Sequence, residues 1–167
     1  MSQSATLYRI GATDFESVVQ DPAYARFRAL SKEFVSLQGT HEGFRFLLSI
    51  GRSAAEKELV TQLFYPAESL EDAHEGEDLS GDAIHYNNPD KVFALASLLA
   101  GVDDTTLTRL YDANELNEND VYPGAWSVTT SADIAFNVTH ILQEWPLLKG
   151  LYTRAASDGD VVISFVG

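Results

Sequence analysis

Residues 158–166 read Asp-Gly-Asp-Val-Val-Ile-Ser-Phe-Val. The Asp158-Gly159 pair is typical of a helix end, because glycine readily takes the left-handed conformation found just beyond a helix. From Val161 to Val166 the chain is apolar on both of its alternating faces, whereas an exposed edge strand is normally interrupted by charge. The segment therefore predicts a strand in the interior of a sheet, directly after a helix.

A long helix is predicted to lead into this strand. Residues 130–133 have the spacing of a capping box, and the apolar residues that follow mark the inner face of a helix. These residues are Ile134, Val138, Ile141, Leu142 and Trp145. Because proline removes a hydrogen bond to the carbonyl of Leu142, we expect either a bend at Pro146 or a new helix that starts there.

The N-terminal third predicts a strand followed by helices. Residues 7–10 are β-prone and end at Gly11, and residues 13–16 again have capping-box spacing. Apolar residues then recur at helical spacing from position 24 to position 37, which predicts one helix of about four turns that ends at Gly39. Residues 41–48 fit a second helix, although the segment 44–50 is also apolar enough for a buried strand.

In the second half, residues 83–86 predict a short strand. Asn88 followed by proline is a helix start, so a helix is expected over residues 89–100, closed by Gly101. Asp103 or Asp104 is expected to cap the next helix, and the polar residues 114–120 to form a connection after it.

Together these elements predict an α+β fold, with a small mixed sheet packed against several helices in a single compact domain over residues 1–167. A chain of this length buries roughly 68–70% of its unfolded surface, which is enough for one self-sufficient core.

The segment 117–126 contains a Tyr-Pro-Gly corner between two large aromatic residues, Tyr122 and Trp126. A Pro-Gly pair suits the central positions of a type II turn. The two aromatic side chains either anchor this loop in the core or form the wall of a pocket. In the second case we expect His85, Tyr86 and Asp120 to complete a concave binding site.

The chain is strongly acidic, with 25 acidic residues against 11 basic residues and a net charge of −14. This charge opposes binding to nucleic acid, which requires lysine and arginine. The acids are dense between Glu68 and Asp82, a stretch that is either a solvated loop or a docking surface for a basic protein or a cation. The chain has no cysteine, and it shows no signal peptide or membrane-spanning run, so a soluble cytoplasmic protein is expected.

The sequence contains no evident catalytic set, and no catalytic residue can be assigned. No serine lies in a nucleophile elbow, and no glycine run has nucleotide-binding spacing. His140 and Glu144 share a helix face, but such pairs are mostly ordinary surface pairs, and nothing nearby supplies a third metal ligand. His85 is the histidine with the most suggestive position, inside a predicted strand. We therefore expect no metal and no cofactor, and favour a protein that is not an enzyme.

Six short motifs occur in the order found in the YfbM-like family, a bacterial group of unknown function (domain of unknown function family 1877). They are the N-terminal strand with its capped helix, the segments 43–49, 76–79 and 89–99, the Tyr-Pro-Gly corner, and the final helix that leads into a strand. Family members often carry Trp-His and a further histidine where this chain has His41, Glu42 and Arg45. The resemblance implies a compact domain of mixed α and β structure and no established catalytic residue.

Two kinds of function follow from these observations. The first is a noncatalytic interaction or regulatory protein that binds a basic protein partner, since the charge is strong and no catalytic set is evident. The alternative is a small-molecule-binding protein or hydrolase with its site near the Tyr-Pro-Gly corner. An acidic face with exposed apolar residues favours the first, and a pocket with converging histidine, aspartate and tyrosine favours the second.

Overall fold

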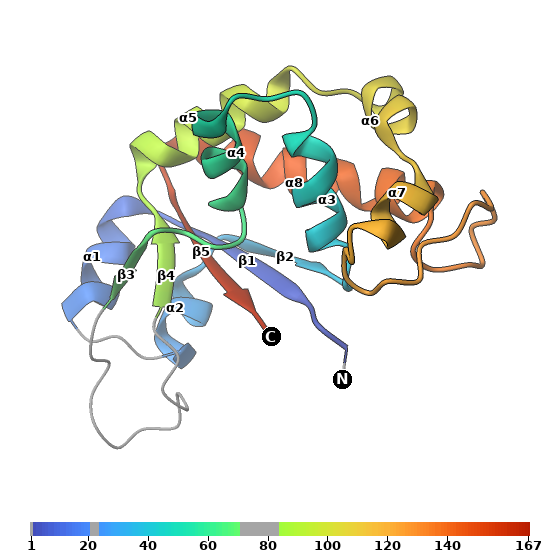
Figure 1. Cartoon of the computed structure of the whole chain (residues 1–167). Helices are drawn as coiled ribbons and strands as arrows, with labels where there is room; N and C mark the ends of the chain where they lie inside the picture. The colour runs from blue at the N-terminus through green and yellow to red at the C-terminus, as the bar shows by residue number, and fades with distance from the viewer. Residues whose placement is uncertain (1, 21–23, 71–83) are drawn as a thin grey trace.

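The computed structural model describes residues 2–20, 24–70 and 84–167. Five described strands form one sheet in the order β2-β1-β5-β4-β3 (Figure 1). The strands are β1 (Ala5–Ile10), β2 (Glu33–Leu37), β3 (Glu68–Leu70), β4 (Ile84–Asn87) and β5 (Val161–Val166). The α+β fold class predicted from the sequence is confirmed.

The C-terminal strand β5 lies in the middle of this sheet, as its apolar sequence predicts. It pairs with β1 over residues 161–166 and with β4 over residues 162–164. All four strand pairings among the described residues are antiparallel, so the expectation of a mixed sheet is wrong. Because neighbouring described strands run in opposite directions, no two of them have to be joined by the long crossover that parallel neighbours require.

Helices cover both faces of the sheet. Figure 1 shows α3, α4, α5 and α8 on one side and α1 and α2 on the other. The described helices are α1 (Ala12–Gln20), α2 (Tyr24–Leu30), α3 (His41–Ser49), α4 (Ala54–Thr61), α5 (Pro89–Ala100), α6 (Asp104–Leu110), α7 (Ala113–Glu118) and α8 (Val138–Asp158). Two apolar clusters result, a larger one between α3, α5, α8 and the sheet, and a smaller one beneath α1 and α2.

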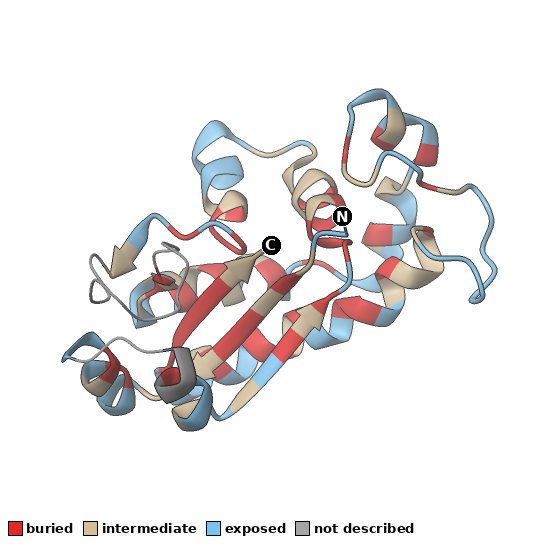
Figure 2. Ribbon diagram, turned by 90° about the horizontal axis from the view of Figure 1, so that it is seen from below, coloured by how far each residue is buried: buried red, intermediate tan, exposed pale blue. Residues whose placement is uncertain are grey.

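The burial pattern follows from these two layers. In Figure 2 the inner strands are buried along most of their length, and the helices are buried on the face turned toward the sheet. Leu7 and Val162 belong to the larger cluster, whereas Tyr8 and Ile163 belong to the smaller one. Successive residues of a strand point to opposite faces, so a central strand that is covered on both sides is apolar at most of its positions.

The single helix expected over residues 24–37 is wrong. The structure instead has α2 and then β2, which pairs with β1 in the register Leu7 to Val35. The apolar residues of β2 fit an alternating pattern as well as a helical one, since Val35 and Leu37 are buried while Phe34 is exposed. Pairing with β1 supplies hydrogen bonds to a distant segment, and this overrides the local periodicity.

The start of α8 also differs from the expectation. Asn137, rather than the capping-box residues 130–133, caps the helix by accepting a hydrogen bond from the backbone of His140. Ile134 therefore lies outside the helix and is exposed. The helix continues through Pro146 without a restart and ends at Gly159, which has the expected left-handed conformation.

The remaining local predictions are mixed. Asn88 caps α5 and Asp103 caps α6 through their side chains, as expected. The segment 41–49 is helical, which decides between the two alternatives left by the sequence. Helix α1 starts at Ala12, before the expected capping box, and the supposed connection 114–120 contains α7. Residues 71–82, which contain most of the dense acidic stretch and also His74, lie outside the described residues.

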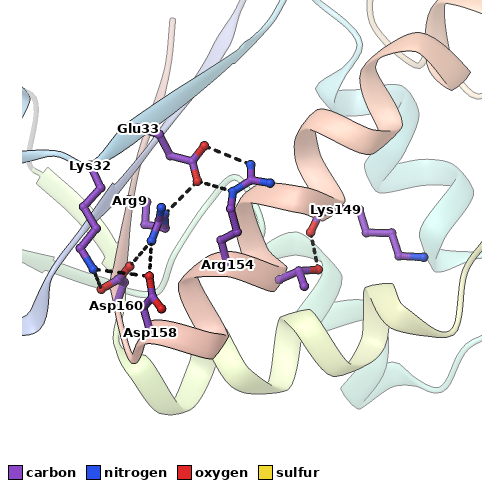
Figure 3. A network of polar contacts seen from close by, with 8 residues as sticks. Arg9, Lys32, Glu33, Lys149, Arg154, Asp158 and Asp160 are labelled. Atoms are coloured by element: carbon purple, nitrogen blue, oxygen red, sulfur yellow. Dashed lines mark hydrogen bonds and ion pairs between the residues drawn. The ribbon is translucent and has the colours of Figure 1, made fainter.

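A network of ion pairs joins the end of α8 to β1 and β2 (Figure 3). The guanidinium of Arg9 donates to Glu33, Asp158 and Asp160, each at 2.8 Å. Lys32 donates to Asp160 at 2.7 Å, and Arg154 binds Glu33 through two nitrogens. Hydrogen bonds from Arg154, reinforced by Arg9, hold the pKa of Glu33 below its ordinary value. The network fixes the helix end from which β5 departs.

Candidate functional site

The Tyr-Pro-Gly corner is a tight turn of a different type from the one expected. The backbone N–H of Gly124 donates to the carbonyl of Val121 at 2.8 Å, so Tyr122 and Pro123 are the central residues. The Tyr122–Pro123 peptide bond is cis, as in type VI turns. The expectation of a type II turn is therefore wrong, although Gly124 does have the positive φ of 74° that glycine accommodates.

Trp126 anchors this corner in the core. Its side chain is 4% exposed, and its indole N–H donates to the carbonyl of Val121 at 3.0 Å. The side chain of Asn117 bonds both the N–H and the carbonyl of Trp126, at 2.9 and 3.0 Å. The indole lies against Gly43 of α3, where an added Cβ would come within 2.4 Å of the ring. The anchoring interpretation therefore describes the observed position of Trp126.

Tyr122 faces the beginning of α3 and is only half-buried. Its hydroxyl accepts a hydrogen bond from the backbone of Gln3 at 2.8 Å. The centre of its ring lies 6.2 Å from that of His41. Tyr122 therefore connects the corner to the first residue of α3.

His41 is fully buried, with 0% of its surface exposed. Neither ring nitrogen has a hydrogen-bond partner among the residues that the structure describes. The nearest carboxylate oxygen belongs to Glu42 and lies 3.9 Å from Nε2, and the ring of Phe64 packs edge-on at 5.9 Å. Burial lowers the pKa of His41, despite the opposite influence of Glu42 and Glu144. Buried polar groups are rarely left unpaired, so this imidazole requires an explanation.

Glu144 lies close to the same helix start and is well satisfied. It accepts hydrogen bonds from the hydroxyl of Thr40 and from the backbone of Gln38. The backbone N–H of Phe136 donates to Nδ1 of His140, which leaves Nε2 of His140 to donate to Glu144 at 3.1 Å. Both members of this pair thus have structural partners. The described part of the chain contains no group of three side chains suited to holding a metal ion.

Beside His41, the residues Glu42, Arg45 and Tyr65 form a small polar group. The hydroxyl of Tyr65 donates to Glu42 at 2.6 Å, and Arg45 binds the other oxygen of the same carboxylate at 3.1 Å. Burial, followed by the hydrogen bond to Glu42, raises the pKa of Tyr65. The sequence did not connect these residues, because α4 separates Tyr65 from α3 along the chain.

The structure does not bring all of the predicted site residues together. His85 is exposed and lies on β4, where it pairs with Ser164 of β5. Strand β4 lies between β5 and β3, so His85 is not on an edge strand. Tyr86 packs against Phe15 on the face covered by α1, whereas Trp126 belongs to the cluster on the opposite face. Asp120 is exposed, next to the corner. Tyr122, Trp126 and Asp120 therefore share one region. His85 and Tyr86 lie on β4 and point to opposite faces of the sheet.

The corner lies within an acidic end of the molecule, which we define as residues 103–137. This acidic end comprises α6, α7 and the loop that leads to α8 (Figure 1). It contains one basic residue, Arg109, and seven exposed acidic residues. The acidic residues are Asp103, Asp104, Asp112, Glu115, Glu118, Asp120 and Asp133. Its loop also exposes two apolar side chains, Val128 at 75% and Ile134 at 42%.

Comparison with known proteins assigns the family. The model of the domain of unknown function DUF1877 matches residues 1–165. The chain belongs to this family. Among solved structures, it is similar to a protein of unknown function, YfbM from Escherichia coli, with 17% identity, full coverage of both chains and a TM-score of 0.67. No curated protein matched the sequence.

The similarity to the Escherichia coli structure supports the fold, and the predicted family membership is confirmed. Within the described residues, no helix has both the length and the apolar composition needed to cross a membrane. Of the residues around the corner, His41 was noticed in the sequence only as a position where the family pattern differs. Its burial could not be foreseen, because Phe64 and Tyr122, which surround it, are distant in the chain.

Proposed function

We propose that this protein is a noncatalytic interaction protein, and that its acidic end binds a basic protein partner. The observation that carries this proposal is the unbalanced charge of residues 103–137. None of the seven carboxylates there forms an ion pair with a residue that the structure describes, and Arg109 is the only basic residue among them. An unpaired cluster of one sign attracts a partner of opposite sign and speeds its association.

The charges elsewhere are arranged differently. Arg9 and Lys32 are bound to carboxylates at the end of α8, and Arg154 is bound to Glu33 of β2 (Figure 3). Arg45 and Arg52 pair with glutamates on or near their own helices. Within each pair the two opposite charges largely cancel, so the pair contributes little to the electric field at long range. A substantial part of the net charge of −14 is thus concentrated in a segment that contains one basic residue, Arg109.

The acidic end also offers apolar contacts. Val128 and Ile134 are exposed on the loop between α7 and α8, and Tyr111 holds the base of this loop by donating to the carbonyl of Ser127 at 2.8 Å. Protein interfaces combine an apolar centre with a polar rim. A partner with basic residues around an apolar patch would match this surface. We further propose that the protein acts in the bacterial cytoplasm, which its lack of cysteine supports.

A defined cationic probe tests the proposal. A labelled synthetic peptide that interleaves lysine and leucine should bind at low salt and release as salt screens the charges. The double variant Glu118→Gln/Asp120→Asn removes two charges from the acidic end, and asparagine tolerates the positive φ of 53° at position 120. We expect its affinity for the peptide to fall about fivefold, since exposed charge pairs contribute modestly.

The matched control is Glu16→Gln/Glu58→Gln, which removes two exposed charges from α1 and α4. It should change the affinity little. An equal loss in both variants would mean that only net charge matters, and the acidic end would not be a docking surface. Crosslinking to proteins of the native host, followed by mapping of the linked positions, then identifies the natural partner.

One observation favours a second candidate, a small-molecule-binding protein with its site near the corner. The unpartnered imidazole of His41 lies beside Tyr122, and a ligand with one hydrogen-bond donor and one acceptor would satisfy it. Host metabolite fractions can be added to the protein while the ring nitrogens of its histidines are observed by NMR. A fraction that shifts His41 and leaves the exposed His85 unchanged supports this candidate, and shifts confined to His85 contradict it.

A further inference from the structure

A cleft lies between the end of α3, the beginning of α4 and the segment that joins α5 to α6. Its volume is about 280 Å³. It is lined by apolar residues such as Leu47 and Val102, and by four polar side chains, Arg52, Glu56, Thr106 and Arg109. Sites for drug-sized ligands usually span about 300–1,000 Å³, so this cleft suits a smaller molecule.

The apolar part of the cleft belongs to the core. Leu47, Leu48 and Val102 are all buried members of the larger apolar cluster. The backbone carbonyl of Val102 already accepts a hydrogen bond from Lys149 at 2.9 Å. These side chains shape the cleft from within the core. The apolar lining that remains partly exposed belongs to Ile50 and Leu110, and such a surface favours the hydrocarbon part of a ligand.

Arg52 is held in place at the cleft. Its Nε donates to the carbonyl of Leu48 at 2.6 Å, and one Nη donates to Glu56 at 2.9 Å. Glu56 is itself fixed by the reciprocal capping bonds with Ser53. The second Nη of Arg52 has no partner among the described residues. A guanidinium that is oriented in advance loses little freedom when it binds an anion.

Arg109 provides a second cation on the other side of the cleft, from α6. It forms no hydrogen bond or ion pair with any residue that the structure describes, and it is exposed. The cleft thus holds two arginines against one glutamate that Arg52 already binds. The lining side chains thus carry one net positive charge in a chain of net charge −14, and Asp103, which accepts hydrogen bonds from Thr106, lies just outside the lining.

We propose that this cleft binds a small organic acid, with its anionic group between Arg52 and Arg109 and its apolar body against Ile50 and Leu110. Two arginines recognise carboxylates well, since guanidinium N–H groups match both carboxylate oxygens. The net negative charge of the chain opposes the approach of anions. A simple acid should therefore bind with a dissociation constant on the order of a millimolar.

Titration of the labelled full-length protein with benzoate, followed by NMR, tests the proposal. Saturable shifts are expected at Gly51, Arg52, Gly101 and Thr106, which lie on the two sides of the cleft. Benzamide has nearly the same shape without the charge, and inorganic phosphate has the charge without the apolar body. Both should bind much more weakly than benzoate. Equal binding by either probe would overturn the proposal.

The variant Arg109→Gln should weaken benzoate binding about tenfold, as expected for the loss of a charged hydrogen bond. Arg28→Gln is the matched control, because Arg28 is exposed on α2, on the other side of the sheet. An equal loss in this control would mean that bulk charge governs the titration. Arg109→Gln should not weaken binding of the lysine–leucine peptide, since the substitution makes the acidic end more negative. The organic-acid site and the proposed protein partner can therefore fail independently.

Discussion

The indole of Trp126 lies directly over Gly43, so close that a Cβ at position 43 would come within 2.4 Å of the ring. This contact joins the Tyr-Pro-Gly corner to α3, two segments far apart in the chain. The indole is buried and held by its bond to Val121. The ring cannot move aside without breaking that bond, so this position favours glycine, which has no Cβ.

Gly43→Ala should therefore destabilise the protein. Alanine in a helix gains about 1 kcal/mol over glycine, whereas overpacking a dense core costs about 1–3 kcal/mol. At this contact distance the overpacking dominates, and urea unfolding should show a loss of roughly 1–2 kcal/mol. Gly150→Ala is the control within α8. Its Cβ would meet only the guanidinium of Arg154, at 2.9 Å. Shifting this exposed group weakens its pair with Glu33 by up to about 1 kcal/mol, which the gain in helix propensity of about 1 kcal/mol offsets, so the variant should unfold no more easily than the wild type.

A second prediction concerns Asp160, whose side chain is only 1% exposed and forms ion pairs with Arg9 and Lys32 (Figure 3). Arg9→Met removes the more buried of these two cations. Leaving a buried carboxylate short of a partner typically costs about 3–5 kcal/mol, and Lys32 remains to offset part of it. We expect a loss of about 3 kcal/mol in chemical unfolding.

The control for Arg9 is Arg154→Met, in the same network. The side chain of Arg154 is 52% exposed and contacts only Glu33 in this network. Exposed ion pairs contribute up to about 1 kcal/mol, so this variant should remain close to the wild type. Equal losses in the two variants would show that burial does not set the strength of the network.

Local signals predicted much of this fold. Asn88, Asp103 and Gly159 mark helix ends through bonds that span only three or four residues, and such bonds can be recognised in the sequence. The central position of β5 followed from its composition, because a strand covered on both faces has no polar side. The predictions failed where pairing with a segment distant in the chain determines the local structure. Strand β2 forms because β1 offers a partner, and the spacing of its own residues does not reveal this.

The candidate site shows the same division. The sequence left two alternatives for Trp126, an anchor in the core or the wall of a pocket, and its 4% exposure fits the anchor, since large aromatic residues are usually buried. The separation of Tyr86 from Trp126 on opposite faces of the sheet depends on strand order, which the sequence did not provide. The burial of His41 depends on Phe64, Tyr122 and α8, which pack around it. No local sequence pattern predicts that arrangement.

The burial of His41 leads to a prediction about pH. Its pKa is lowered in the folded protein, mainly by burial, whereas in the unfolded chain histidine titrates near 6.5. The unfolded state therefore binds more protons once the pH falls below about 6.5, and acid favours unfolding. The contribution of His41 to stability is complete above this pH and is lost as the pH falls through its lower folded pKa.

His41→Phe removes the titrating group, keeps an aromatic ring, and eliminates two unpaired nitrogens. Its free energy of unfolding should decrease less than that of the wild type between about pH 7 and about pH 5. His85→Gln is the control, since His85 is exposed, and it should follow the wild type. Urea unfolding at several pH values gives all three curves. Parallel curves for the wild type and His41→Phe would mean that the imidazole stays satisfied in solution, and the site near the corner would lose its main support.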